Sequence, residues 1–117
     1  MQLNEVNFDG AVPVDSYGPG FFRIGGEVIN GAMIAVEAQA RTWAGLPDEA
    51  ALIALADQAD VIFVGMGAEI AHLPRPLREA LEETGVGVEV MSSPSACRTY
   101  NVLLSEGRRV ALAVLPL

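Results

Sequence analysis

Met91–Val110, MSSPSACRTYNVLLSEGRRV, contains within twenty residues the end of a strand, the start of a helix, the single cysteine of the chain and a charged turn that leads into the next strand. The Ser-Ser-Pro sequence at 92–94 is typical of a loop that leaves a strand. Ser95 is a suitable N-cap, because its hydroxyl can accept a hydrogen bond from a free amide of the first helical turn. The pattern therefore predicts a helix over 96–106 that ends at Gly107.

Strand and helix patterns alternate around this segment, which is typical of crossover units on a parallel sheet. The unbroken apolar run Val61–Val64 predicts a central strand covered on both faces. Valines that alternate with other residues over 86–91 predict a strand that is less covered. The expected helices are 47–60, 76–84 and 96–106, and the expected strands are 60–65, 86–91 and 108–115.

The N-terminal third predicts an antiparallel meander. Its apolar runs are Phe21–Ile24, Glu27–Ile29 and Ala32–Val36. Gly25–Gly26 suits a two-residue hairpin turn, because glycine readily adopts positive φ. Asn30–Gly31 is either a second turn or a bulge, and we expect a bulge because the apolar run resumes at once. A further edge strand is expected within 7–14, with a turn at 17–20.

Composition and charge exclude several classes of function. The 117 residues fit a single domain over 1–117, and 51% hydrophobic residues are typical of a packed chain. The formal charge of −8 repels a phosphate backbone, so we expect no nucleic acid partner. Every cation is arginine, which excludes a Schiff-base or P-loop lysine. One Cys and one His are too few for an internal disulfide or a protein-built zinc site, so we expect no metal and no cofactor.

The sequence also predicts no stable membrane insertion. Its longest apolar runs, such as Ala32–Val36, fall far short of the roughly 20 residues that a membrane-spanning helix needs. Met1–Asp9 has two acidic residues and no basic residue, which fits neither a secretory signal nor a transit peptide. We therefore expect a cytoplasmic protein.

Two loops are expected to meet, because turns at the carboxyl ends of neighbouring parallel strands line the ligand crevice of an open sheet. They are the Gly65–Gly67 loop and the 92–97 loop, and their amides and hydroxyls, with Arg98, would suit a small anion or carboxylate. The first loop lacks the third glycine of a dinucleotide fingerprint, since Ile70 stands in its place. The candidate ligand-binding residues are Gly65, Gly67, Ser95, Cys97, Arg98 and Asn101.

Cys97 allows three interpretations: a buried core residue, a reactive thiolate, or a residue that lines a ligand site or an interface. It lies at the edge of the apolar arc that contains Tyr100, as expected of a small buried side chain. It also lies in the first helical turn, where free amides and the helix dipole would lower the pKa of a thiol. His72 is either a base for such a thiolate or a surface residue, and Trp43 is expected to fill the core or an interface. No catalytic set is complete.

Three segments carry a resemblance to a known family: Val61–Gly67, Val88–Met91 and above all Ser95–Arg109, SACRTYNVLLSEGRR. Scattered matches extend it to Asp9, Gly10, Tyr17, Phe22, Gly31 and Trp43. The chain resembles the family of unknown-function domains that includes mitochondrial complex I assembly factor 3 and the adipogenesis-associated domain-containing protein. The resemblance implies a three-layer α/β fold with a mixed central sheet, which agrees with the antiparallel N-terminal meander and the βαβαβ C-terminal part. It implies no known reaction.

Two classes of function follow as hypotheses. The first is a non-enzymatic interaction or assembly module, for which the edge of the apolar N-terminal meander could pair with a protein partner. The second is a binding protein or enzyme for a small anion or carboxylate, with its site near Gly65–Gly67 and Cys97–Arg98. We favour the first. The sequence leaves open whether the chain forms a homo-oligomer.

Overall fold

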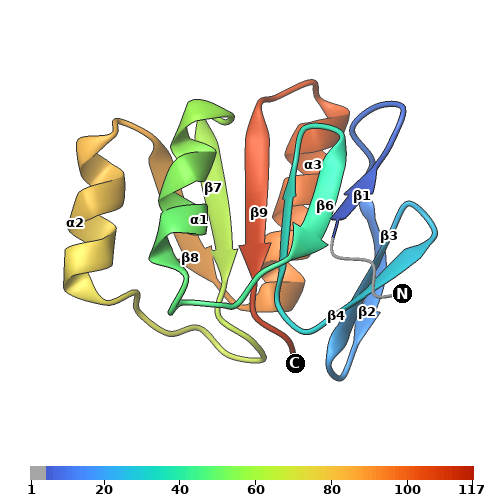
Figure 1. Ribbon diagram of the computed structural model, residues 1–117, viewed down its shortest axis with the longest axis horizontal. Helices are drawn as coiled ribbons and strands as arrows, with labels where there is room; N and C mark the ends of the chain where they lie inside the picture. Colours follow the sequence, from blue (N-terminus) through green and yellow to red (C-terminus); the bar gives the residue numbers. More distant parts are fainter. Residues whose placement is uncertain (1–4) are drawn as a thin grey trace.

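The computed structural model describes residues 5–117, which form a six-stranded sheet, a three-stranded sheet and three α-helices (Figure 1). The strands are β1 (Glu5–Asn7), β2 (Val14–Gly18), β3 (Phe21–Ile24), β4 (Glu27–Asn30), β5 (Met33–Val36), β6 (Gln39–Thr42), β7 (Val61–Gly65), β8 (Gly87–Met91) and β9 (Val110–Val114). The helices are α1 (Glu49–Ala54), continued by a 3-10 turn at Leu55–Asp57, α2 (Arg75–Glu83) and α3 (Ser93–Ser105).

The six-stranded sheet is mixed, in the order β1-β6-β5-β9-β7-β8. β9, β7 and β8 are parallel, with Val61 opposite Val110 on one side and Gly87 on the other. β1, β6 and β5 are antiparallel, and β5 joins the two halves by pairing antiparallel with β9. The predicted mixed α/β fold with a βαβαβ C-terminal part is confirmed.

The helices and the small sheet cover the two faces of the large sheet. The chain moves outward from β7 to β8 through α2 and returns past β7 to β9 through α3, so crossovers of one hand place α2 and α3 on opposite faces. α1 and α2 share a core with Ile62 and Val64 of β7. α3 and the three-stranded sheet share the other core, with Phe63 of β7. Figure 1 shows the small sheet beside α3, away from β8.

The apolar runs fall on the strands in the middle of the large sheet. Met33–Val36 and Val110–Val114 are buried at every position, because both faces of β5 and β9 are covered. Trp43 lies in the core on the α1 side with 6% of its surface exposed, and its indole N–H donates to the Asp48 carbonyl oxygen (3.0 Å). The core position expected of Trp43 is confirmed.

The N-terminal meander divides between the two sheets. Gly25 and Gly26 (φ 56° and 81°) form the expected hairpin turn between β3 and β4. The bulge expected at Asn30–Gly31 is wrong: β4 ends at Asn30, and Gly31, with φ 83°, turns the chain into the other sheet. The apolar run resumes after Gly31 because β5 enters the buried middle of the large sheet, a change of sheet that local pattern does not reveal.

α3 begins earlier than its sequence predicts. Ser92 is the N-cap, with its hydroxyl oxygen accepting from the Ser95 amide (3.4 Å), so the predicted loop at 92–94 is mostly the first helical turn. The prediction that Ser95 is the N-cap is therefore wrong. Pro94 fits the first turn, because the amide hydrogen that proline lacks has no partner there in a helix.

Other boundaries also differ from their predicted positions. The edge strand expected within 7–14 is replaced by β1, which ends at Asn7, and β2, which begins at Val14. The turn expected at 17–20 is confined to Pro19–Gly20. The first helix begins later than predicted, because its N-cap is Asp48, whose carboxylate accepts from the Ala51 amide (3.2 Å), and it ends earlier, because the chain passes into the 3-10 turn at Leu55–Asp57.

Candidate functional site

The two loops expected to form a crevice do meet. The Gly67 amide donates to the Ser93 hydroxyl oxygen (2.9 Å), and the Ser93 amide donates back to the Gly67 carbonyl oxygen (2.7 Å). The Ser93 hydroxyl donates to the Leu115 carbonyl oxygen (2.6 Å), which fixes the chain after β9 at the same place. We call this set of Gly65, Gly67, Ser93 and Leu115 the closed junction.

Direct packing fills the closed junction. Ser93 is fully buried, and a Cβ atom on Gly65 would lie 2.6 Å from Ser93 Cα and 2.7 Å from Val114 Cγ1. Real Cβ atoms do not approach other heavy atoms so closely, so Gly65 is required for the contact between β7 and the start of α3. The Gly67 amide, which the sequence suggests as a donor to a ligand, already donates to the Ser93 hydroxyl oxygen and so stabilises the fold.

Cys97 is a core residue. Its side chain is 2% exposed and packs with Tyr100 and Phe63 in the core on the α3 side. Burial raises the pKa of the Cys97 thiol to about 12, and the charge of Arg98 opposes this only in part. Desolvation thus outweighs the first-turn position that favoured a thiolate.

His72 cannot act as a base for Cys97, because the sheet separates them. The residue after His72, Leu73, packs in the core on the α1 and α2 side, whereas Cys97 packs in the core on the α3 side. Of the two interpretations of His72, the structure therefore contradicts the base for Cys97 and agrees with the surface residue.

The remaining candidate residues form local contacts. The Arg98 guanidinium is exposed and donates to the Ser95 hydroxyl oxygen (3.2 Å). Asn101 holds β2 against α3: its side-chain oxygen accepts from the Val14 amide (2.8 Å), and its side-chain nitrogen donates to the Val14 carbonyl oxygen (2.9 Å). The structure thus brings Gly65 and Gly67 together with Ser93. Cys97 and Asn101, four residues apart, lie on the side of α3 that packs against the small sheet, whereas Arg98 lies on the exposed side.

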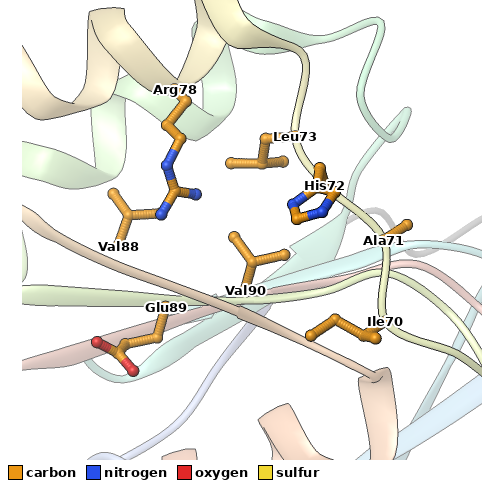
Figure 2. Close-up of a pocket in the computed structure, with 8 residues that line it drawn as sticks. All are labelled: Ile70, Ala71, His72, Leu73, Arg78, Val88, Glu89 and Val90. Atoms are coloured by element: carbon orange, nitrogen blue, oxygen red, sulfur yellow. The ribbon is translucent and has the colours of Figure 1, made fainter.

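An open groove lies elsewhere, along β8. Its volume is about 450 Å³, and it lies between β8, the loop that leaves β7 and the helix α2 (Figure 2). Its lining residues are Ile70, Ala71, His72, Leu73, Arg78, Val88, Glu89 and Val90. We call this cavity the β8 groove.

The β8 groove has an apolar floor and a basic wall. Figure 2 shows Val88 and Val90 on the side of β8 that faces Arg78 and Leu73, whereas Glu89 points away. Ile70 is 70% exposed at one end. The ion pair of Arg78 with Glu82 on the same helix is long (3.9 Å) and half exposed to solvent, so it holds Arg78 weakly. The groove therefore combines exposed apolar surface with an available guanidinium.

Sequence reasoning missed Ser93 and the β8 groove. Ser93 was expected in a loop, and its burial depends on three segments far apart in the sequence. The groove had one signal, the alternation of valines over 86–91, which predicted a strand that is partly uncovered. Its walls come from the loop at 70–73 and from α2, which only the tertiary fold brings beside that strand.

Residues 5–117 contain no cluster of three His, Cys, Asp or Glu side chains placed to hold a metal ion. None of the helices in that range is both long and apolar enough to cross a membrane.

The fold and both sites define a small three-layer α/β domain with a mixed sheet. Residues 14–115 match the family described as "Protein of unknown function (DUF498/DUF598)", and the chain belongs to this family. The predicted family is thereby confirmed.

Two relatives show the range of this family. An uncharacterized protein of Rhodobacter capsulatus is 55% identical over 117 residues, which are all of this chain and 94% of the relative. NADH dehydrogenase (ubiquinone) 1 alpha subcomplex assembly factor 3 of Danio rerio is 32% identical over 108 residues, covering 86% of this chain and 62% of that protein. The chain thus spans less than two thirds of the assembly factor.

Two solved structures share the fold. The crystal structure of an outer membrane protein from Bartonella henselae has a TM-score of 0.82 and 33% identity, covering 93% of this chain and 98% of that one. The solution structure of a Mth938-like domain from Bordetella pertussis has a TM-score of 0.75 and 26% identity, covering 99% and 92% of the two chains.

Proposed function

We propose that this chain is a protein-interaction module that acts in the assembly of a larger complex and catalyses no reaction itself. The observation that carries the proposal is the β8 groove, where Ile70 is 70% exposed beside the partly buried Val88 and Val90. Exposed apolar surface beside a groove is typical of a protein contact site, because it is unfavourable in water until a partner covers it. Similarity to an assembly factor over 86% of the chain supports the same class of function.

The proposal places the protein in the cytoplasm, where a surface charge of −8 keeps it dispersed while the groove selects a partner. The edge of the small sheet is a second contact surface within the same proposal, since Val28 on β4 is 43% exposed. Its other apolar side chains, Phe22, Ile24 and Ile29, are buried in the core shared with α3 and are not available to a partner.

A small anion or carboxylate bound near Arg98 is the second candidate function, favoured by the exposed guanidinium beside the Ser95 hydroxyl. It has less support than protein interaction, because the Gly67 amide, which would complete the site, is engaged by Ser93. Phosphate and acetate at 10 mM should each leave the melting temperature unchanged within about 1 °C. A shift of several degrees that Arg98→Ala abolishes would favour this second candidate.

The direct test is affinity purification of the full chain from its native host under mild salt. The proposal predicts a protein partner in stoichiometric amount, recovered from repeated preparations and from both N-terminally and C-terminally tagged chains. Repeated recovery of the chain alone, with either tag, would contradict it.

A further inference from the structure

The first observation is that β8 is an open edge. β8 pairs with β7 on one side, and no strand among the described residues pairs with its other side. The Gly87 amide donates to the residue before β7 (2.9 Å), and the Met91 carbonyl oxygen accepts from the residue after β7 (2.9 Å). Because the peptide groups of a strand alternate in direction, Val88 and Val90 direct their N–H and C=O groups away from β7, toward the free edge.

The second observation is that the free edge and the β8 groove coincide. The side chains of Val88 and Val90 form the floor of the groove (Figure 2), and the same two residues carry the backbone groups that have no strand partner among the described residues. A strand added at this edge would place every second side chain over that floor, within reach of Ile70. One segment could thus form hydrogen bonds with the free N–H and C=O groups of β8 and at the same time cover the apolar surface of the groove.

The third observation is the charge of the groove wall. Figure 2 shows the Arg78 side chain near Val88 and the His72 ring on the side of Val90, and the side chain of Glu89, a residue that also lines the groove, points away from both. A carboxylate on the groove side of an added strand could accept hydrogen bonds from the Arg78 guanidinium and the His72 imidazole. The basic wall is local, since the chain as a whole has a charge of −8.

From these three observations we infer that the β8 groove binds an extended segment of a partner protein, which adds to the sheet as a strand beside β8. The segment has apolar residues at alternate positions, facing Val88, Val90 and Ile70, and an Asp or Glu among them that reaches Arg78. The inference rests on the proposed function and names its site and the chemistry of its partner.

A second copy of this chain fits the edge less well. In the antiparallel register that pairs the free groups of Val88 with those of Val90 in the other copy, the two Glu89 side chains stand opposite each other. Like charges in that position destabilise a strand pair, and two chains of charge −8 repel each other over their whole surfaces. The edge is therefore suited to a different partner.

The test uses a phage-displayed library of random nine-residue peptides, selected against the full chain. We expect enriched peptides with apolar residues at alternate positions and at least one Asp or Glu. Titration of a synthetic selected peptide should shift the amide resonances of Val88 and Val90 in a ¹⁵N spectrum while those of Gly67 and Cys97 stay in place.

Two variants with a matched control test the contacts. Arg78→Glu should lower the affinity for the selected peptide about tenfold or more. A new selection against this variant should enrich peptides with Lys or Arg in place of the acidic residue. Ile70→Asp should weaken it by a similar factor. Arg75→Glu, on the same helix but with a side chain that is 89% exposed outside the groove, should change binding less than about twofold.

Several outcomes would overturn the inference. One is that no peptide is enriched, and another is that the selected peptides shift resonances of residues away from β8. A third is that Arg78→Glu and Arg75→Glu weaken binding equally. The last is that the chain is a dimer in sedimentation equilibrium and that its Val88 amide is protected from hydrogen exchange in that dimer. If affinity purification still recovers a partner that binds Ile70→Asp as well as the unchanged chain, the groove is wrong as the site and the proposed function stands. If no partner is recovered but peptides bind at β8, the proposed function fails and the site stands.

Discussion

The closed junction lies where the chain leaves β7 and β8, and the β8 groove lies along β8 beside the loop that follows β7, yet the two differ in almost every physical respect. The junction contains small and polar residues, and its hydrogen bonds join Gly67, Ser93 and Leu115 with no space between them. The groove contains valines, an exposed isoleucine and an arginine around about 450 Å³ of open volume. The residues that look most like a ligand site in the sequence stabilise the fold, and ordinary residues form the open surface.

The difference has a simple physical cause. Glycine and serine allow two backbones to approach closely, and the same features make them suitable for ligand binding when one of the two backbones is absent. Here the second backbone is the start of α3, so the amides bind within the chain. An edge strand has free backbone groups whatever its side chains, because it has a neighbour on one side only.

At the closed junction the largest expected effect is that of Gly65→Ala. Its new Cβ would lie 2.6 Å from Ser93 Cα, which is backbone and cannot move aside alone. We expect the free energy of unfolding to fall by about 3 kcal/mol, as for severe overpacking. Urea denaturation measures it, and Gly10→Ala is the control, since nothing lies within 4 Å of a Cβ there. Equal stability of the two variants would show that the junction is loose.

Ser93→Ala is expected to cost about 2 kcal/mol. It removes the hydroxyl that joins the Gly67 amide to the Leu115 carbonyl oxygen and leaves these groups without that partner. Ser105→Ala is the matched control, since its hydroxyl is exposed and donates only to Val102 within the same helix. A loss below about 0.5 kcal/mol for Ser93→Ala in urea denaturation would mean that the junction does not depend on this hydroxyl.

Alkaline pH should destabilise the core beside the junction. Burial raises the pKa of Cys97 from 9.0 to about 12 and that of Tyr100 from 10.0 to about 12. The folded state therefore keeps both protons while the unfolded state loses them, so stability is complete below pH 9 and falls as the pH rises toward 12. From pH 8.5 to 10.5 we expect a loss of about 2–3 kcal/mol, most of it from Cys97.

Urea denaturation at each pH checks this expectation, and Cys97→Ala should lose part of the pH dependence. Native Cys97 should also react with iodoacetamide at pH 8 far more slowly than in 8 M urea. Rapid alkylation of the native chain would show that the thiol is accessible and its pKa ordinary.

The smallest expected effect belongs to the groove. Ile70→Asp should change the free energy of unfolding by less than about 0.5 kcal/mol, because the side chain is 70% exposed. Leu73→Asp, three residues along the same loop, is the contrast: Leu73 is 6% exposed, and a buried unpaired carboxylate should cost about 3 kcal/mol or more. Thermal unfolding of both variants compares them, and similar losses would mean that Ile70 is part of the core.

The sequence predicts the C-terminal half better than the N-terminal third, for a physical reason. Val61–Val64 is apolar at every position because β7 is covered on both faces, so the run alone indicates a central strand. Asn30–Gly31 carries no evidence that the chain changes sheets there, because a turn within one sheet and a turn between two require the same glycine. Strand partners are chosen by tertiary packing.

The candidate site was only partly predictable. The meeting of the two loops follows from parallel strands, but their contact distance depends on the angle at which α3 starts, which no local pattern records. A helical wheel leaves Cys97 at the edge of the apolar arc, and the small sheet packed against α3 completes its burial. The groove was not predictable, because Ile70, Arg78 and Val88 belong to three separate segments that only the tertiary fold brings together.

The central claim is that the open edge of β8, and not the closed junction, is the contact surface. Amide hydrogen exchange by NMR tests it most directly, residue by residue, in the free chain and with the selected peptide bound. We predict that the Val88 and Val90 amides exchange about 100-fold faster than those of Gly87 and Glu89 in the free chain and become protected in the complex. Equal protection along β8 in the free chain, or new protection at Gly67 and Cys97 instead of Val88 and Val90, would contradict the claim.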